Sequence, residues 1–102
     1  MFMAIVQYPA IKQGKDEEFR EWFSWSNGVF AKFDGFVSRR LLKPRSGSGN
    51  YVGVVEHESE ETFKAMHSSE EHKKAGERVV PLFDGKPSPS FYEVIVDSDN
   101  KR

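Results

Sequence analysis

Residues 16–33, DEEFREWFSWSNGVFAKF, decide the fold, because their aromatic side chains recur at helical spacing. An apolar residue at every third or fourth position produces one apolar stripe along an α-helix. The stripe consists of Phe19, Trp22, Phe23, Ser26, Val29, Phe30 and Phe33. Three acids at residues 16–18 open the segment, where the helix dipole favours negative charge. We predict a helix from Asp16 to about Lys32 that buries an aromatic face.

Four segments around this helix are rich in Val, Ile, Phe and Tyr and predict β-strands. They are residues 2–8, 36–43, 51–57 and 90–97. In the first strand both alternating rows are largely apolar, as Ala4 on one side and Met3 and Ile5 on the other illustrate. A sheet in a small monomer normally keeps one face in water. Two apolar faces therefore indicate that helices cover one side and a partner covers the other.

A split helical region separates the last two predicted strands. Ser59 is suited to be the N-cap of a short helix through His67. Ser68 and Glu71 have the spacing of a capping box for a second helix, which Pro81 should stop. This order of elements predicts an α+β, ferredoxin-like split βαβ fold, with a four-stranded antiparallel sheet and helices on one face. The simplest cover for the open face is a second copy, so we expect a homodimer through the sheet faces.

Composition limits the classes of function. The 102 residues suffice for one domain, over residues 1–97, and we expect a disordered tail over residues 98–102. Fifteen basic and sixteen acidic residues give a net charge of −1, which leaves no basic excess for binding nucleic acid. The lack of cysteine excludes disulfides, thiolate metal sites and thiol catalysis. The N-terminus reads as a strand rather than a leader, and no segment has the roughly 20 apolar residues of a membrane span. We expect a cytoplasmic protein with no membrane partner.

The three histidines show no metal-ligand spacing. His72 shares a helix face with Ala75 and Gly76, so we predict that it points inward. Two interpretations are open for His72 and equally for His67. Each can be a buried histidine bonded to the backbone, or it can contact a ligand and exchange a proton. His57, at the end of a strand, is predicted to lie at the surface.

Two tryptophans on the first helix have a structural and a functional interpretation. Trp22 and Trp25 can both be core residues. Alternatively, they form the wall of a pocket in which a flat aromatic ligand stacks on the indoles, while Ser26 or Asn27 donates a hydrogen bond.

Arg39 and Arg40 point to opposite faces of their strand, so one of them should face a dry side of the sheet. A buried arginine needs a negative partner. Glu56 or Glu93 on neighbouring strands can supply one. The alternative is that the arginine binds the carboxylate or phenolate of a substrate.

Several segments together resemble a known family. They are Glu18-Phe19, Phe33-Asp34-Gly35-Phe36, Tyr51–Glu56, Phe63–His72 and Phe91–Val94. Over residues 1–97 the chain resembles the antibiotic biosynthesis monooxygenase domain of the dimeric α/β-barrel superfamily. The resemblance implies a ferredoxin-like protomer whose sheet packs on its twin in a homodimeric α/β barrel, with a pocket between each sheet and its helices.

The resemblance leaves two oxygenase branches to consider. One branch degrades haem with an Asn, a Trp and a His, and these positions fall here on Val6, Met66 and Gly76, which do not match. The other branch oxidises polycyclic phenols or quinols without a cofactor. There the substrate anion reduces oxygen, and the protein supplies a dry pocket and a proton acceptor.

We therefore predict a monooxygenase that oxidises a planar aromatic phenol or quinol without a cofactor or metal. His72 or His67 is the expected base. The expected substrate-binding residues are Trp22, Trp25, Ser26, Asn27, Arg40 and Met66. The alternatives are a haem-binding or haem-degrading monooxygenase that uses His72 or His67, and a non-catalytic dimeric protein that binds small molecules.

Overall fold

The central strand of the sheet is β1 (Phe2–Gln7). It pairs antiparallel with β4 (Val52–His57) on one side and with β6 (Ser88–Glu93) on the other. The strand β3 (Phe36–Leu42) completes the order β3-β4-β1-β6 by pairing with β4. The computed structural model describes residues 1–98, so most of the predicted tail, residues 99–102, lies outside the described residues. The predicted four-stranded antiparallel sheet is confirmed.

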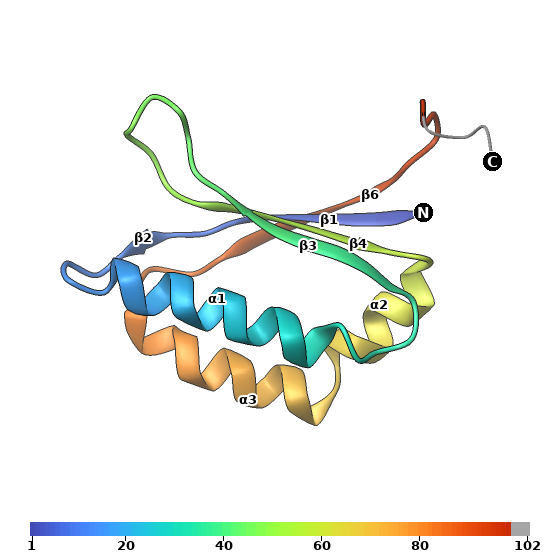
Figure 1. Cartoon of the computed structure of the whole chain (residues 1–102), viewed down its shortest axis with the longest axis horizontal. Helices are drawn as coiled ribbons and strands as arrows, with labels where there is room; N and C mark the ends of the chain where they lie inside the picture. Colours follow the sequence, from blue (N-terminus) through green and yellow to red (C-terminus); the bar gives the residue numbers. More distant parts are fainter. Residues whose placement is uncertain (99–102) are drawn as a thin grey trace.

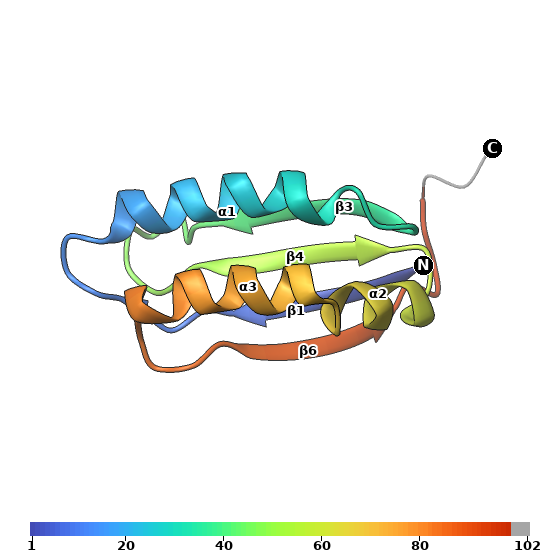
Figure 2. The same ribbon diagram turned by 90° about the horizontal axis from the view of Figure 1, so that it is seen from below.

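Three helices cover one face of this sheet, as the two views in Figures 1 and 2 agree. They are α1 (Asp16–Phe30), α2 (Glu60–His67) and α3 (Glu70–Val79). A 3₁₀ turn, η1 (Val80–Leu82), follows α3 at Pro81, which cannot continue an α-helix. The predicted α+β architecture with helices on one face is therefore confirmed. Among the described residues, no helix is long and apolar enough to cross a membrane.

The caps of α2 and α3 were predicted with one error. The Ser59 hydroxyl accepts a hydrogen bond from the Thr62 amide at 3.1 Å and caps α2 as expected. The cap of α3 is Ser69, whose hydroxyl accepts from the His72 amide at 3.1 Å. The predicted cap, Ser68, instead ends α2, because both its amide and its hydroxyl donate to the Lys64 carbonyl. With Ser69 as the cap, α3 begins at Glu70 and His72 is its third residue.

The last strand was predicted too far toward the C-terminus. Strand β6 ends at Glu93, opposite Phe2, because β1 offers no further partner beyond its own first residues. The Val94 amide still donates to the Met1 carbonyl, but Ile95 and Val96 are 88% and 85% exposed. Two short strands that the sequence did not predict, β2 (Ala10–Ile11) and β5 (Phe83–Asp84), pair with each other.

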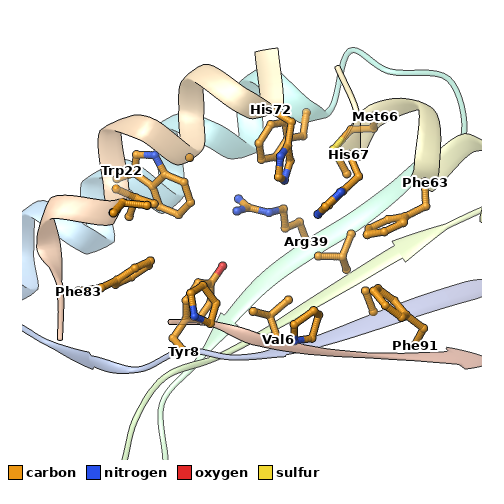
Figure 3. A pocket seen from close by; sticks show the side chains of 18 residues that line it. Val6, Tyr8, Trp22, Arg39, Phe63, Met66, His67, His72, Phe83 and Phe91 are labelled. Atoms are coloured by element: carbon orange, nitrogen blue, oxygen red, sulfur yellow. The ribbon is translucent and has the colours of Figure 1, made fainter. Parts of the chain in front are cut away.

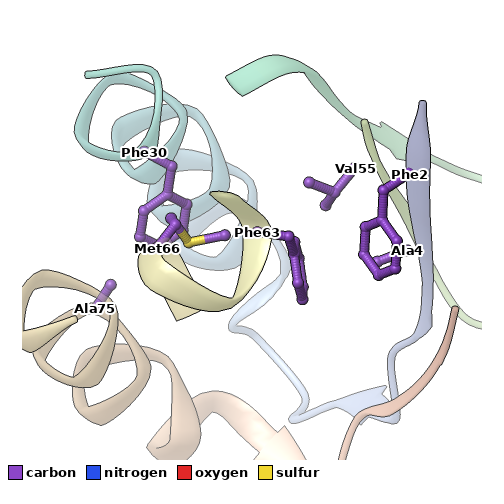
Figure 4. Packing of buried hydrophobic residues seen from close by; sticks show 7 residues of the cluster. All are labelled: Phe2, Ala4, Phe30, Val55, Phe63, Met66 and Ala75. Carbon is purple, nitrogen blue, oxygen red and sulfur yellow. The ribbon is translucent and has the colours of Figure 1, made fainter. Parts of the chain in front are cut away.

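The core lies between the sheet and the helices and is dominated by aromatic rings. One cluster, shown in Figure 4, joins the start of β1 and the second half of β4 to all three helices. Its members are Phe2, Ala4, Phe30, Val55, Phe63, Met66 and Ala75. A second cluster fills the other end of the same layer, with Tyr8, Phe19, Phe23, Tyr51, Val79, Leu82 and Phe83. The predicted aromatic face of α1 supplies Phe19, Phe23 and Phe30 to these clusters, so burial of this face accounts for the position of α1.

The predicted surface position of His57 is wrong. His57 is fully buried, because the row of β4 that includes Val55 faces the helices. Its Nδ1 lies 2.9 Å from the Thr62 hydroxyl, and its ring packs edge-on against Phe36 and Phe63. Burial lowers the pKa of His57, so its neutral form is favoured in the folded chain. This histidine connects β4 to α2 and does not line the cavity described below.

Candidate functional site

A cavity of about 310 Å³ lies between the sheet and the helices. Its lining comes from all four strands of the main sheet, from the three helices and from the chain that follows α3. Figure 3 shows the side chains that converge on it. Most of them are apolar, and the polar groups come from Tyr8, Trp22, Arg39, His67 and His72. None of the lining residues in the described part of the chain is a carboxylate, so this lining is apolar with a small set of cationic, imidazole, indole and phenol groups.

His67 and His72 form a pair at the cavity, at the end of α2 and the start of α3. Their ring centroids are 4.3 Å apart. His72 also stacks on Phe30 at 5.3 Å, and His67 stacks on Phe63 at 5.5 Å. Among residues 1–98, neither imidazole makes a hydrogen bond, in contrast to the interpretation of a histidine held by the backbone. Aromatic stacking therefore orients both rings.

The environment of His72 favours its neutral form. Burial, the neighbouring His67 and the cation of Arg39 together lower the pKa of His72 to about 4. At neutral pH its imidazole therefore carries one proton and has one nitrogen free to accept another. A neutral imidazole beside a cation can take a proton from a bound acid, because the anion that forms offsets the repulsion between the imidazolium and Arg39.

Trp22 and Met66, two of the residues that the sequence singled out, also line the cavity. The Trp22 indole nitrogen donates to the Ala75 carbonyl at 2.9 Å, which fixes the ring between α1 and α3. The indole ring also stacks on Phe19 at 5.9 Å. The structure thus brings together Trp22, Met66, His67 and His72.

The other predicted binding residues do not line the cavity. Trp25 is 40% exposed, and its ring lies under the guanidinium of Arg78 at 4.0 Å, on the outer side of the helix layer. Ser26 is fully buried, and Asn27 lies beside it on α1; both accept hydrogen bonds from Arg39. Arg40 is exposed on the face of the sheet that carries no helix.

A β-bulge decides that Arg39, and not Arg40, faces the helices. The register of β3 shifts between Phe36 and Ser38, which pair with consecutive residues of β4. Simple alternation from Phe36, which faces the core, would turn Arg40 inward. The extra residue in the bulge reverses that alternation, and Arg39 then lies opposite Val55 on the helix side. The sequence signal for this choice is weak because a bulge has no fixed composition at such a site.

The predicted carboxylate partners do not reach Arg39. Glu56 lies on the open face and accepts from the Ser38 hydroxyl at 2.6 Å, and Glu93 pairs with the N-terminal amine at 3.1 Å. The predicted ion pair is therefore wrong. Arg39 Nη1 instead donates to three oxygens of α1: the Ser26 hydroxyl at 2.7 Å, the Asn27 side-chain carbonyl at 2.8 Å and the Phe23 carbonyl at 3.3 Å.

Tyr8 is a cavity residue that the sequence analysis did not select. Burial raises the pKa of Tyr8, and the nearby cation of Arg39 offsets part of this effect, so the phenol stays neutral at neutral pH. Gly53 gives the ring its space, because a Cβ at this position would come within 3.0 Å of the Tyr8 ring. A glycine inside a predicted strand indicates that another group approaches closely, but the sequence does not identify that group as Tyr8.

Residues 1–78 match the family model for antibiotic biosynthesis monooxygenase. The chain belongs to the antibiotic biosynthesis monooxygenase family. A solved structure from Nitrosomonas europaea, assigned to the same family, superposes with a TM-score of 0.81 at 16% identity, over 94% of this chain and 100% of that one. SnoaB from Streptomyces nogalater, a cofactor-independent oxygenase, gives 0.76 at 17% identity over 96% and 94% of the two chains.

A protein from Mycobacterium tuberculosis gives a TM-score of 0.80 at 13% identity, over 96% of this chain and 99% of that one. These identities are low, so the superpositions establish the fold and leave the substrate open. No curated protein matches the sequence.

The positions that a haem-degrading member would use for Asn, Trp and His do lie at the cavity of this family member. Val6, Met66 and Gly76 all line it. They offer two apolar side chains and a bare backbone in place of an amide, an indole and an imidazole. Within the described part of the chain, no cluster of His, Cys, Asp and Glu could hold a metal ion. The residues present therefore do not fit the haem site of that branch.

Proposed function

We propose that this protein is a cofactor-independent monooxygenase that oxidises a planar phenol or quinol in the cavity between sheet and helices. The observation that carries the proposal is a neutral imidazole, His72, facing the same apolar cavity as a stationary cation, Arg39. The family supports an oxygenase, and SnoaB is a neighbour whose described activity needs no cofactor. Val6, Met66 and Gly76 do not fit the haem site of the haem-degrading branch, which also favours an oxygenase without a cofactor.

The chemistry needs a base, a dry space and oxygen. Proton transfer from the substrate hydroxyl to His72 would leave a phenolate, which is a far better electron donor to O₂ than the neutral phenol. One oxygen atom enters the ring carbon and the other leaves as water, and the substrate supplies all four electrons. Apolar walls suit this step because they exclude water from the reactive intermediate. His67, whose ring centroid lies 4.3 Å from that of His72, is the alternative base.

The binding roles follow from position. Trp22 and Met66 would contact the flat faces of the ring system, since both line the cavity. Ser26 and Asn27 would act through Arg39, whose position their oxygens fix. Trp25 and Arg40 would contribute little to binding because they lie outside the cavity.

We also propose that the protein works as a homodimer joined through the open face of the sheet. That face carries Met3, Ile5, Val52 and Val54 in its central strands, an apolar surface with no helix over it. The loop between β3 and β4 and the segment after β6 both project on this side, as Figure 1 shows. The latter carries the exposed Ile95 and Val96. A second copy would cover the apolar strands, and the β3–β4 loop and the segment after β6 would contact its edges.

The test of the function is oxidation of anthrone to anthraquinone by the metal-free protein under ¹⁸O₂. We expect oxygen uptake well above the buffer rate and one ¹⁸O atom in each quinone formed. Tight binding without uptake would contradict the proposal and leave a non-catalytic binding protein. Titration with hemin addresses the remaining alternative, since a shift of the Soret band at micromolar protein would indicate haem binding through His67 or His72.

A further inference from the structure

Arg39 is a half-buried cation that has no negative partner among residues 1–98. None of the ion pairs formed within residues 1–98 includes it, and none of the described residues that line its cavity is a carboxylate. Burial lowers its pKa to about 10, which still leaves the guanidinium charged at neutral pH. A buried charge is costly unless an opposite charge and hydrogen bonds compensate it. Three neutral oxygens supply the hydrogen bonds here, and the described part of the chain supplies no opposite charge.

The guanidinium is also held in one orientation. All three hydrogen bonds to α1 use Nη1. The group lies over the Phe23 ring at 3.9 Å and over the Phe30 ring at 4.8 Å, which fixes its plane. In the described residues, no Arg39 nitrogen is both buried and unpartnered, so the remaining donors face the open cavity or the Tyr8 hydroxyl. Figure 3 shows the guanidinium among Trp22, His72 and Tyr8.

We propose that Arg39 binds the anionic oxygen of the substrate, so that the cavity holds planar aromatic phenols as phenolates once His72 has taken the proton. This inference rests on the proposed function and names its substrate class. The free donors of the guanidinium would hold the phenolate oxygen beside His72. The ligand would supply the negative charge that residues 1–98 do not place beside Arg39, and charge-assisted hydrogen bonds are the stronger kind. An aryl carboxylate shares this chemistry, but a carboxylate cannot become the electron donor that the proposed reaction requires.

The probe is 2-hydroxyanthraquinone, whose visible absorption shifts when its hydroxyl ionises, and its methyl ether is the matched ligand that cannot ionise. Both compounds already contain the oxidised anthraquinone ring that the proposed reaction forms, so the measurement stands apart from turnover. We expect the wild-type protein to lower the pKa of the bound phenol by about 1 to 3, as a cation within 4–6 Å does. The methyl ether should bind at least about tenfold more weakly.

Three variants locate the effect. In Arg39→Gln the pKa of the bound phenol should return to its value in free solution, and the phenol and its methyl ether should bind equally well. Arg39→Lys should keep part of the lowered pKa and part of the preference for the phenol. Arg78→Gln is the control, because Arg78 also lies over an aromatic ring but outside the cavity. Circular dichroism checks that each variant is folded.

Two results would overturn the proposal even if Arg39→Gln failed to fold. One is equal affinity of the wild-type protein for the phenol and its methyl ether. The other is binding of anthraquinone-2-carboxylate through Arg39 with no ionisation of the bound hydroxyl compound, which would make the substrate class an aryl acid. Loss of oxygenase activity alone, with the spectroscopic shift retained, would count against the proposed function and leave the role of Arg39 supported.

Discussion

Replacing His72 with alanine should lower kcat/KM for anthrone by about 100-fold or more, the usual contribution of a general base. The imidazole faces the cavity in its neutral form, next to Arg39, and among residues 1–98 its ring makes no hydrogen bond that would assign it a purely structural task. Without it, the substrate must lose its proton to water, which the apolar walls exclude.

Variants at neighbouring positions distinguish a loss of catalysis from a loss of folding. Lys73→Ala changes the next, exposed residue of α3 and should leave turnover and melting temperature unchanged. His67→Ala should have the smaller effect of the two histidine variants if His72 is the base. Wild-type turnover by a folded His72→Ala protein would remove His72 from the mechanism, and a greater loss in His67→Ala would transfer the role to His67.

The pH dependence of kcat/KM tests the role of His72 independently. Because the pKa of His72 is lowered to about 4, its base form persists as the pH falls through 6.5, where an ordinary histidine would be half protonated. A plot of kcat/KM against pH should therefore show no acid limb near 6.5, and the activity that depends on His72 should be lost only as the pH approaches 4.

Replacing Val54 with lysine should convert the protein from a dimer to a monomer. Val54 lies on the middle of the open face, opposite Ile5 on β1 and Arg40 on β3. A buried lysine without a partner in a sheet-to-sheet interface costs several kcal/mol, enough to separate a dimer at micromolar concentration. Sedimentation equilibrium should give twice the chain mass of 11.7 kDa for the wild type and one chain mass for the variant.

The matched control places the same lysine on the helix layer. Glu77→Lys changes an exposed residue of α3 and should leave the dimer intact. A folded wild-type chain that sediments as a monomer at these concentrations would refute the dimer and would leave the open face unexplained.

Much of the fold was predictable because periodicity reports burial directly. The aromatic repeat in residues 16–33 marked the buried face of α1, and strand alternation marked β1 and β4. The errors in the prediction lie at the ends of elements, where the exact boundary residue depends on contacts with other elements. Ser68 and Ser69 are chemically equal as caps, and only the end of α2 selects between them. The length of β6 depends on its partner β1, which local composition does not report.

The candidate site was predictable in part for the same reason. His72, Trp22 and Met66 lie on helix faces whose direction follows from the sequence repeat, and they line one cavity. The choice between Arg39 and Arg40 depends on the bulge before Ser38, so the sequence could pose the alternative but not resolve it. Tyr8 enters the cavity through a contact with Gly53, 45 residues away in the numbering, and such long-range space is not visible in a local pattern.

The central claim is that a planar aromatic ligand occupies the cavity between the helices and the sheet. The chain has two tryptophans, Trp22 at the cavity and Trp25 outside it, so their indole N–H signals in a ¹⁵N NMR spectrum serve as paired reporters. Trp25→Phe assigns the signals. Addition of 2-hydroxyanthraquinone should shift the Trp22 signal through the ring current of the ligand and leave the Trp25 signal in place. A saturable shift of Trp25 alone, or no shift of either at millimolar ligand, would contradict the account.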